Sequence, residues 1–235
     1  MDEGDIYNQP LDIFHVLSTA FAVYRQHLST FLQIGLFYGA ANVLAEVLIK
    51  TFGQANSAWI LLINVLISAI GVILIFDTYR RIHGKKAVDI KDSLSIARNI
   101  MPTVFAIHLS MIILFFLSLL LMGSLGMIAV IPGLYFSTIF IFAEIIAVIE
   151  KKSYIECFKT SAVMVKGMFI KVLSFNIILM FIIILPILAL KSLWSLGAAV
   201  PFVYRILNVF LIVSLPVFQG VAQAELYYQS KTRRI

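Results

Sequence analysis

Long uncharged stretches dominate the chain. Five of them contain no Asp, Glu, Lys or Arg: 26–45, 51–76, 99–143, 172–190 and 206–224. A helix crosses the roughly 30 Å hydrocarbon core of a bilayer in about 20 residues, so four of these stretches each fit one crossing. The third stretch corresponds to about 68 Å of helix at 1.5 Å per residue, enough for two crossings. We therefore expect six membrane spans, at 29–50, 58–78, 103–122, 127–149, 169–190 and 204–226.

Amphipathic stretches precede the first, third and fifth of these spans. They cover residues 11–28, 91–101 and 152–167. In the first, Ile13, Leu17 and Tyr24 recur at helical spacing among polar residues. Helices with one apolar face, next to basic residues, lie in the plane of the lipid headgroups. The pattern therefore predicts three interfacial helices.

The fold class that follows is an all-α polytopic membrane protein. Its single domain, residues 1–235, has six transmembrane helices and three amphipathic interfacial helices on the cytoplasmic side. The spans lack the period-2 alternation of barrel strands, which excludes a membrane β-barrel. Interfacial helix, span, turn and span follow one another three times, at a period of roughly 65–75 residues, which indicates a threefold hairpin repeat. Alternatively, any six-span hairpin protein with basic connections has this outline.

Composition excludes most soluble classes of protein. Of the 235 residues, 61% are hydrophobic and 13% are charged, about half the charged fraction of an ordinary soluble domain. The mean hydropathy is +1.01. These values exclude a disordered chain, a nucleic-acid-binding module and a water-soluble enzyme, so nucleic acid is not an expected partner.

The distribution of basic residues predicts the orientation in the membrane. Of the 18 Lys and Arg residues, 15 fall on the side of the two termini and of the connections after the second and fourth spans. The other three are Lys50, Lys191 and Arg205. Because cytoplasmic connections carry the excess of Lys and Arg, both termini are expected in the cytoplasm.

Residues 131–171 carry a family resemblance. They read IPGLYFSTIFIFAEIIAVIEKKSYIECFKTSAVMVKGMFIK, with Pro132-Gly133 in the outer half of a span, Glu150 at its end and Ser161 in the following helix. This pattern resembles bacterial six-span inner-membrane proteins of unknown function that are related to the membrane domain of glycerophosphoryl diester phosphodiesterases. The resemblance implies the fold and the bacterial cytoplasmic membrane. It does not imply phosphodiesterase activity, because those enzymes carry their active site on a separate soluble barrel, which is not expected here.

Three carboxylates within spans are candidates for function, because an ionisable group in the hydrocarbon is costly. They are Glu46, Glu144 and Glu225. If Glu144 and Glu225 pair across the bundle, they form an acidic site in the inner leaflet for a cation or a proton. Alternatively, these groups reach the membrane surface or bond to amides on other helices. The candidate amides are Asn64, Asn176 and Asn208.

Histidine and cysteine offer little site chemistry in this sequence. His108 in the third span either relays protons or donates a hydrogen bond to a neighbouring carbonyl group. The four histidines and the single Cys157 do not have metal-ligand spacing, and no catalytic or nucleotide-binding motif is present. We expect no metal, no cofactor and no enzymatic activity.

Proline and glycine mark special backbone positions within the spans. Pro132-Gly133, Pro186 and Pro216 are expected to kink or interrupt helices. Interrupted helices expose backbone groups for binding in transporters, but neighbouring helices also repair such breaks in other membrane proteins. Gly35 and Gly39 form a small-xxx-small pair that favours close packing of the first span against another helix.

These features predict a permease-like or lipid-handling subunit. Its basic surface is expected to meet anionic headgroups or a cytoplasmic protein partner, and a second copy of the chain is a further candidate partner. The residues of this surface are Lys152, Lys159, Lys166 and Lys171. The alternative is a scaffold or assembly factor that transports nothing and whose polar residues only join helices.

Overall fold

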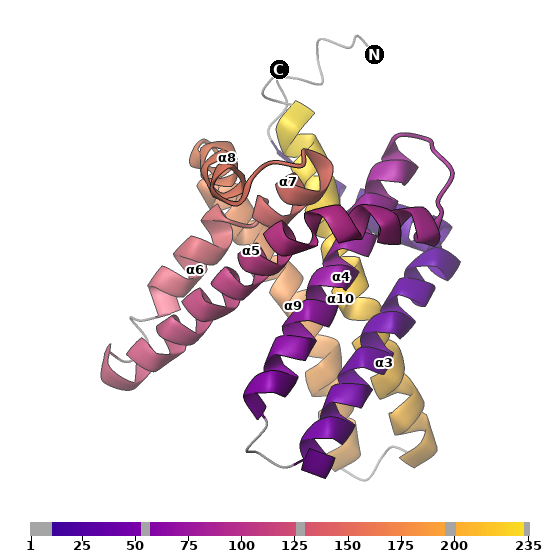
Figure 1. Cartoon of the computed structure of the whole chain (residues 1–235). Helices are drawn as coiled ribbons and strands as arrows, with labels where there is room; N and C mark the ends of the chain where they lie inside the picture. The colour runs from indigo at the N-terminus through magenta and orange to yellow at the C-terminus, as the bar shows by residue number, and fades with distance from the viewer. Residues whose placement is uncertain (1–10, 53–56, 126–129, 196–200, 233–235) are drawn as a thin grey trace.

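The computed structural model describes residues 11–52, 57–125, 130–195 and 201–232. Within these ranges the regular elements are helices and no strand occurs, which confirms the all-α prediction. Figure 1 shows them as a bundle of long and short helices. The helices are α2 (Ile13–Gln26), α3 (Leu28–Phe52), α4 (Ser57–His83), α5 (Ile90–Leu125), α6 (Val130–Ile139), α7 (Ala143–Ile149), α8 (Tyr154–Lys166), α9 (Phe169–Ser195) and α10 (Pro201–Thr232).

Five stretches of the described helices are long and apolar enough to cross a membrane: Leu62–His83, Ile90–Ser118, Ile131–Ile149, Phe169–Trp194 and Ile206–Thr232. A shorter apolar stretch, Leu28–Phe37, begins α3. Large apolar side chains cover the outside of the bundle, among them Trp59, Leu120 and Ile170. Apolar surface on this scale requires lipid rather than water around it.

The helices contact one another in a cyclic order. The hairpins are α3 with α4, α5 with α6 and α7, and α9 with α10. The first helix of each hairpin packs against its own partner and against the second helix of the preceding hairpin: α3 against α10, α5 against α4, and α9 against α6. The short helices follow the same cyclic order of hairpins: α2 packs against α10 of the third hairpin, and α8 packs against α7 of the second. A threefold repeat of helical hairpins predicts this order.

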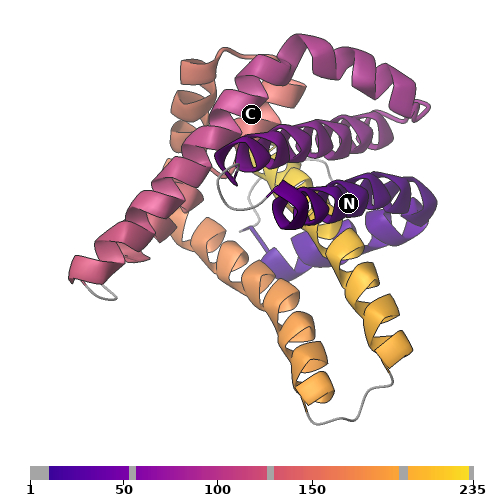
Figure 2. The ribbon, with the colours of Figure 1, turned by 60° about the horizontal axis from the view of Figure 1, so that its bottom comes forward.

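The second hairpin begins with one helix where the sequence predicts two. The expected interfacial helix 91–101 and span 103–122 are joined in α5, which contains Pro102. Proline lacks the N–H group for the helical ladder and bends a helix that continues through it. Figures 1 and 2 show α5 changing direction along its length. The amphipathic stretch is therefore the bent start of the span.

The expected span 127–149 is interrupted between α6 and α7. The Ser161 hydroxyl of α8 donates to the Ile139 carbonyl (2.7 Å) and accepts from the Phe142 N–H (3.2 Å). A single side chain thus bonds backbone groups on both sides of the break, where helical partners are missing.

None of the predicted helix-breaking residues ends a helix. Pro132 lies within α6 as the structure describes it, Val130–Ile139. Gly133 allows α6 to approach α5, because a Cβ atom there would lie 2.8 Å from the Ser118 hydroxyl. The helices α9 and α10 continue through Pro186 and Pro216. The prediction that these residues interrupt helices is therefore wrong, and the alternative that they kink them stays a prediction.

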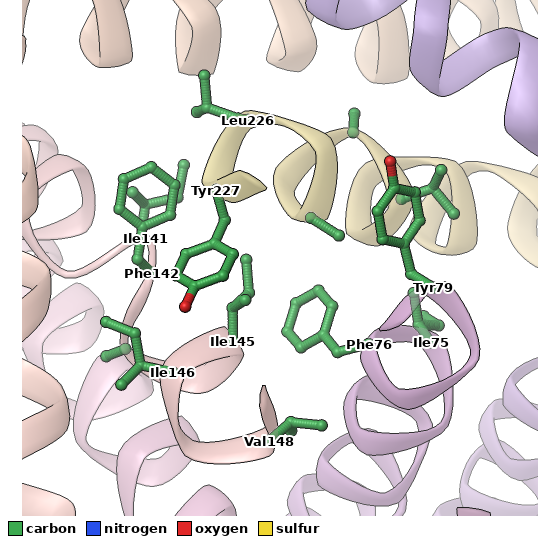
Figure 3. Close-up of a cluster of buried hydrophobic side chains, with 14 of the residues drawn as sticks. Ile75, Phe76, Tyr79, Ile141, Phe142, Ile145, Ile146, Val148, Leu226 and Tyr227 are labelled. Atoms are coloured by element: carbon green, nitrogen blue, oxygen red, sulfur yellow. The ribbon is translucent and has the colours of Figure 1, made fainter. Parts of the chain in front are cut away.

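A buried apolar core joins the second helices of the three hairpins. Figure 3 shows side chains from α4, α7 and α10 grouped together, including Phe76, Ile145 and Tyr227. The rings of Phe142 and Tyr227 meet edge to face with their centroids 5.9 Å apart. This core lies at the end of the bundle formed by α7, α8 and the C-terminal ends of α4 and α10, called the basic end below.

Glycines bring α3 and α10 into close contact, as the small-xxx-small pattern predicts. A Cβ atom on Gly39 would lie 2.9 Å from Cγ2 of Val213, and one on Gly35 would overlap the Val213 carbonyl oxygen. In a bilayer a helix surface is in apolar surroundings whether it contacts lipid chains or another helix. Close packing therefore supplies much of the attraction between helices.

Candidate functional site

A cavity of about 650 Å³ lies between α5, α6, α7, α9 and α10. Most of its lining is apolar, with Met111, Ile112, Leu179 and Ile183 as examples. The polar side chains that line it are His108, Ser118, Ser137, Glu144, Asn176, Gln219 and Gln223. An apolar cavity with a few convergent polar groups is the usual form of a small-molecule site. It is called the amphipathic cavity below.

Most of the polar side chains of this cavity lie toward the basic end. The lining of α5 extends from His108 to Ser118, about 15 Å along the helix axis. Asn176 and Gln223 lie in the halves of α9 and α10 nearer the basic end, and His108 lies nearer to that end along α5 than Leu114 and Ser118 do. The cavity therefore has most of its polar side chains toward the basic end, with Ser118 near its other end and apolar side chains along most of its length.

An interaction between His108 and Glu144 is the main polar contact of the cavity. His108 Nδ1 lies 2.6 Å from Glu144 Oε1, and each side chain is about one-fifth exposed (20% and 19%). The break in the span places Glu144 in the first turn of α7, where the helix dipole favours a carboxylate. The pair connects α5 to α7 within the second hairpin, and both side chains line the cavity.

This contact differs from the sequence-based predictions. Those predictions paired Glu144 with Glu225 and considered either a proton relay or a backbone carbonyl partner for His108. The structure gives His108 a carboxylate partner instead. The spans are apolar on all sides, so their sequences do not show which faces meet.

Glu225 lies on another face of α10 and does not approach Glu144. It accepts a hydrogen bond from the Tyr79 hydroxyl of α4 and one of 2.8 Å from Gln229 Nε2. Glu225 follows the cavity-lining Gln223 by two residues, which turns its side chain about 200° around the helix. The predicted acidic pair is absent from the arrangement, and Glu225 joins α10 to α4.

The remaining candidate residues have different positions. Asn176 of α9 lines the amphipathic cavity, as a polar site residue would. The side chain of Glu46 lies outside the described residues.

The four lysines of the predicted basic surface differ in exposure. Lys159 and Lys166 are exposed on α8, whereas Lys152 is bonded to Glu150 (2.7 Å) and Thr160 (3.2 Å). Lys171 is half-buried in α9. The predicted basic surface therefore has two freely exposed members on α8.

Glu150 forms a polar junction that the sequence analysis did not identify. It accepts hydrogen bonds from Lys231 Nζ (2.6 Å) and the Tyr227 hydroxyl (2.5 Å), both on α10, and pairs with Lys152 Nζ (2.7 Å). Burial raises the pKa of this carboxyl, but the three donors outweigh burial and lower the pKa to about 2. The residue therefore stays ionised and connects α7 to α10.

Asp77 forms a second junction, at the end of α4. Its buried carboxylate accepts hydrogen bonds from Arg80, from Arg81 Nε (2.9 Å) and from the Ser93 hydroxyl of α5 (2.7 Å). The only sequence signal for these junctions is the acid that ends each even-numbered span. Asp77, Glu150 and Glu225 each reach the neighbouring hairpin, so these acids hold the basic end together.

Among the described residues, no group of three or more His, Cys, Asp or Glu side chains is arranged to hold a metal ion. No protein-family model, curated protein or solved structure matches the chain. The fold and the site alone therefore define its class. It is an all-α, multi-pass integral membrane protein with an amphipathic cavity within the bundle.

Proposed function

We propose that the protein handles lipids in a bacterial cytoplasmic membrane. The amphipathic cavity would hold the polar part of a lipid at His108 and Glu144 and its hydrocarbon chain along α5 and α9. The observation that carries this proposal is the cavity's polarity, because a membrane lipid has the same division into a polar and an apolar part. The family resemblance of residues 131–171 remains a prediction that agrees with this location.

The proposed orientation places the basic end in the cytoplasm. The excess of Lys and Arg on this side supports it. Most of the polar groups of the cavity then lie in the cytoplasmic half of the bilayer, the side from which a lipid of that leaflet would enter. A lipid entering from this leaflet would not have to turn over in order to bind.

The test is lipid binding by the full chain in mild detergent, followed by native mass spectrometry. Met180→Trp fills the cavity, and Ile182→Trp is its matched control, because Met180 lines the cavity on α9 whereas Ile182 is exposed outside it. We expect Met180→Trp to weaken binding of palmitoyl lysophosphatidylethanolamine at least about tenfold, and Ile182→Trp to leave it unchanged.

A second pair of variants tests the polar end. Glu144→Gln removes the charge beside His108, and Glu156→Gln makes the same change on the exposed surface of α8. We expect only Glu144→Gln to weaken binding of the same probe, by about tenfold, since hydrogen bonds to charged groups contribute that much. Equal binding by Met180→Trp, Glu144→Gln and the original chain would refute the proposed lipid site.

The scaffold hypothesis has support of its own. Asp77, Glu150 and Glu225 are used in bonds between hairpins rather than in a site. A stable partner protein recovered from membranes, together with no lipid specifically retained by the original chain, would favour a scaffold over a lipid-handling protein.

A further inference from the structure

A second cavity, of about 370 Å³, lies at the basic end where α4 finishes. Unlike the amphipathic cavity, it is lined almost wholly by basic or titratable side chains. The two cavities share no lining residue. It is called the cationic cavity below, and its lining residues are Arg80, Arg81, His83, Gly84, Lys86 and Tyr228.

The cationic cavity is built on fixed groups. Asp77 holds both arginines, and Arg81 Nη1 also contacts Asp92 (3.2 Å) and the Ala87 carbonyl (3.4 Å). The rings of His83 and Tyr228 stack with centroids 4.0 Å apart and planes 11° from parallel. A side chain that is already held in place loses little conformational freedom when it binds a ligand.

The turn after α4 fixes the backbone at Lys86. Its N–H donates to the Arg81 carbonyl (2.9 Å), and the Gly84 N–H donates to the Arg80 carbonyl (3.0 Å). Lys85 adopts a φ of 51°, the left-handed conformation that commonly ends a helix. A non-glycine residue in this conformation is uncommon and is held there by its surroundings.

The nearby carboxylates do not pair with all of the basic side chains that line the cavity. Asp77 and Asp92 are occupied by Arg80 and Arg81, and within the described ranges no carboxylate pairs with His83 or Lys86. An arginine has five N–H donors, of which Arg80 uses one on Asp77. Arginine and lysine donors in this number suit an oxyanion with several acceptor oxygens.

We propose that the cationic cavity binds a phosphate group. Its place at the end of the span Leu62–His83 is the depth of lipid headgroups, so the phosphate belongs either to a lipid or to a free phosphate ion. Bound there, it contacts α4 through Arg80 and α10 through Tyr228. The site is separate from the amphipathic cavity, and its binding does not depend on the proposed lipid-handling function.

The experiment uses the detergent-solubilised full chain and two phosphate sources. Dipalmitoyl phosphatidic acid is compared with dipalmitoylglycerol, which has the same chains without phosphate, by native mass spectrometry. Inorganic phosphate is compared with chloride at equal ionic strength by thermal unfolding. We expect phosphatidic acid to bind at least about tenfold more tightly than dipalmitoylglycerol if the source is a lipid, and phosphate to raise the unfolding temperature above chloride if the source is the free ion.

Three variants assign the effect to this cavity. Arg80→Gln and Lys86→Gln remove lining charges, and Asp77 keeps Arg81 and Ser93 as partners in both. Lys159→Gln removes the same charge from the exposed surface of α8 and is the matched control. We expect the first two variants to weaken the phosphate-dependent signal about tenfold and the control to retain it.

The proposal fails if neither phosphate source gives a signal, or if that signal survives in Arg80→Gln and Lys86→Gln, or if Lys159→Gln loses it equally. Met180→Trp and Glu144→Gln must leave the signal intact. They alter the amphipathic cavity only, so failure of one site is distinguishable from failure of the other.

Discussion

The amphipathic cavity and the basic end use their carboxylates in different ways. Glu150, at the basic end, has three donors around it, and Asp77 there likewise accepts from three side chains. Glu144, six residues before Glu150, has one partner among the described residues, His108, and faces a cavity. Fully paired carboxylates stabilise the fold, whereas one with unused acceptors beside a cavity is available to a ligand.

The largest expected effect on stability is at Asp77. Asp77→Ala removes a carboxylate with no exposed side-chain surface and leaves Arg80 and Arg81 without their common partner. Breaking a buried charge pair in this way costs about 3 kcal/mol of unfolding free energy. Denaturant unfolding in detergent micelles measures it. Asp92→Asn, at a carboxylate 61% exposed, should cost less than about 1 kcal/mol; equal losses would contradict the role given to Asp77.

A substitution at the close contact between α3 and α10 should have the next largest effect on the unfolding free energy. Gly35→Leu forces a side chain into the Val213 backbone, and such overpacking costs about 2 kcal/mol. Ala40→Leu, at an exposed position of α3, is the control and should be nearly neutral by the same unfolding measurement. If both variants unfold alike, the glycine contact does not hold α3 and α10 together.

Ser161→Ala tests the break between α6 and α7. The variant loses one hydrogen bond to each side of the break, and we expect a loss of about 1.5 kcal/mol. Amide hydrogen exchange should also become faster at Phe142. Ser95→Ala, at an exposed position of α5, should change neither quantity. Unchanged exchange at Phe142 would show that the serine does not stabilise the break.

Stability should also depend on pH through Glu150. Its pKa in the folded protein is about 2, below the ordinary 4.5, so the folded state binds the proton less readily than the unfolded state. The contribution of Glu150 to the unfolding free energy is therefore complete above pH 4.5 and is lost as the pH falls from 4.5 toward 2. We expect about 1 kcal/mol, because water screens the partly exposed lysines. Glu150→Gln should remove this part of the pH dependence; an unchanged profile would contradict it.

The smallest effect on stability is expected at Glu144. In Glu144→Gln the amide oxygen still accepts a hydrogen bond from His108, so the unfolding free energy should change by less than about 0.5 kcal/mol. Lipid binding should nevertheless fall, as proposed above. A large loss of stability in this variant would show that Glu144 is structural, like Glu150, and would remove the contrast between the two regions.

The sequence predicts the helical membrane fold because hydrophobic length and charge are local properties. It does not predict which faces of the spans meet, since helices such as α9 are apolar on every side. For this reason the pairing of His108 with Glu144, and the separation of Glu225 from both, required the structure. The break after Ile139 was also missed, because no proline or glycine marks it and its stabilising partner, Ser161, lies 22 residues farther along the chain.

The hydroxyl that bridges the interrupted span has a mechanical consequence. Ser161 belongs to the helix that lies along the membrane surface under the proposed topology, and it is bonded to the backbone immediately before α7, whose second residue is Glu144. A displacement of α8 would therefore be passed by these two bonds to the start of α7. One hydroxyl group thereby links the position of α8 to the geometry of the carboxylate beside the cavity.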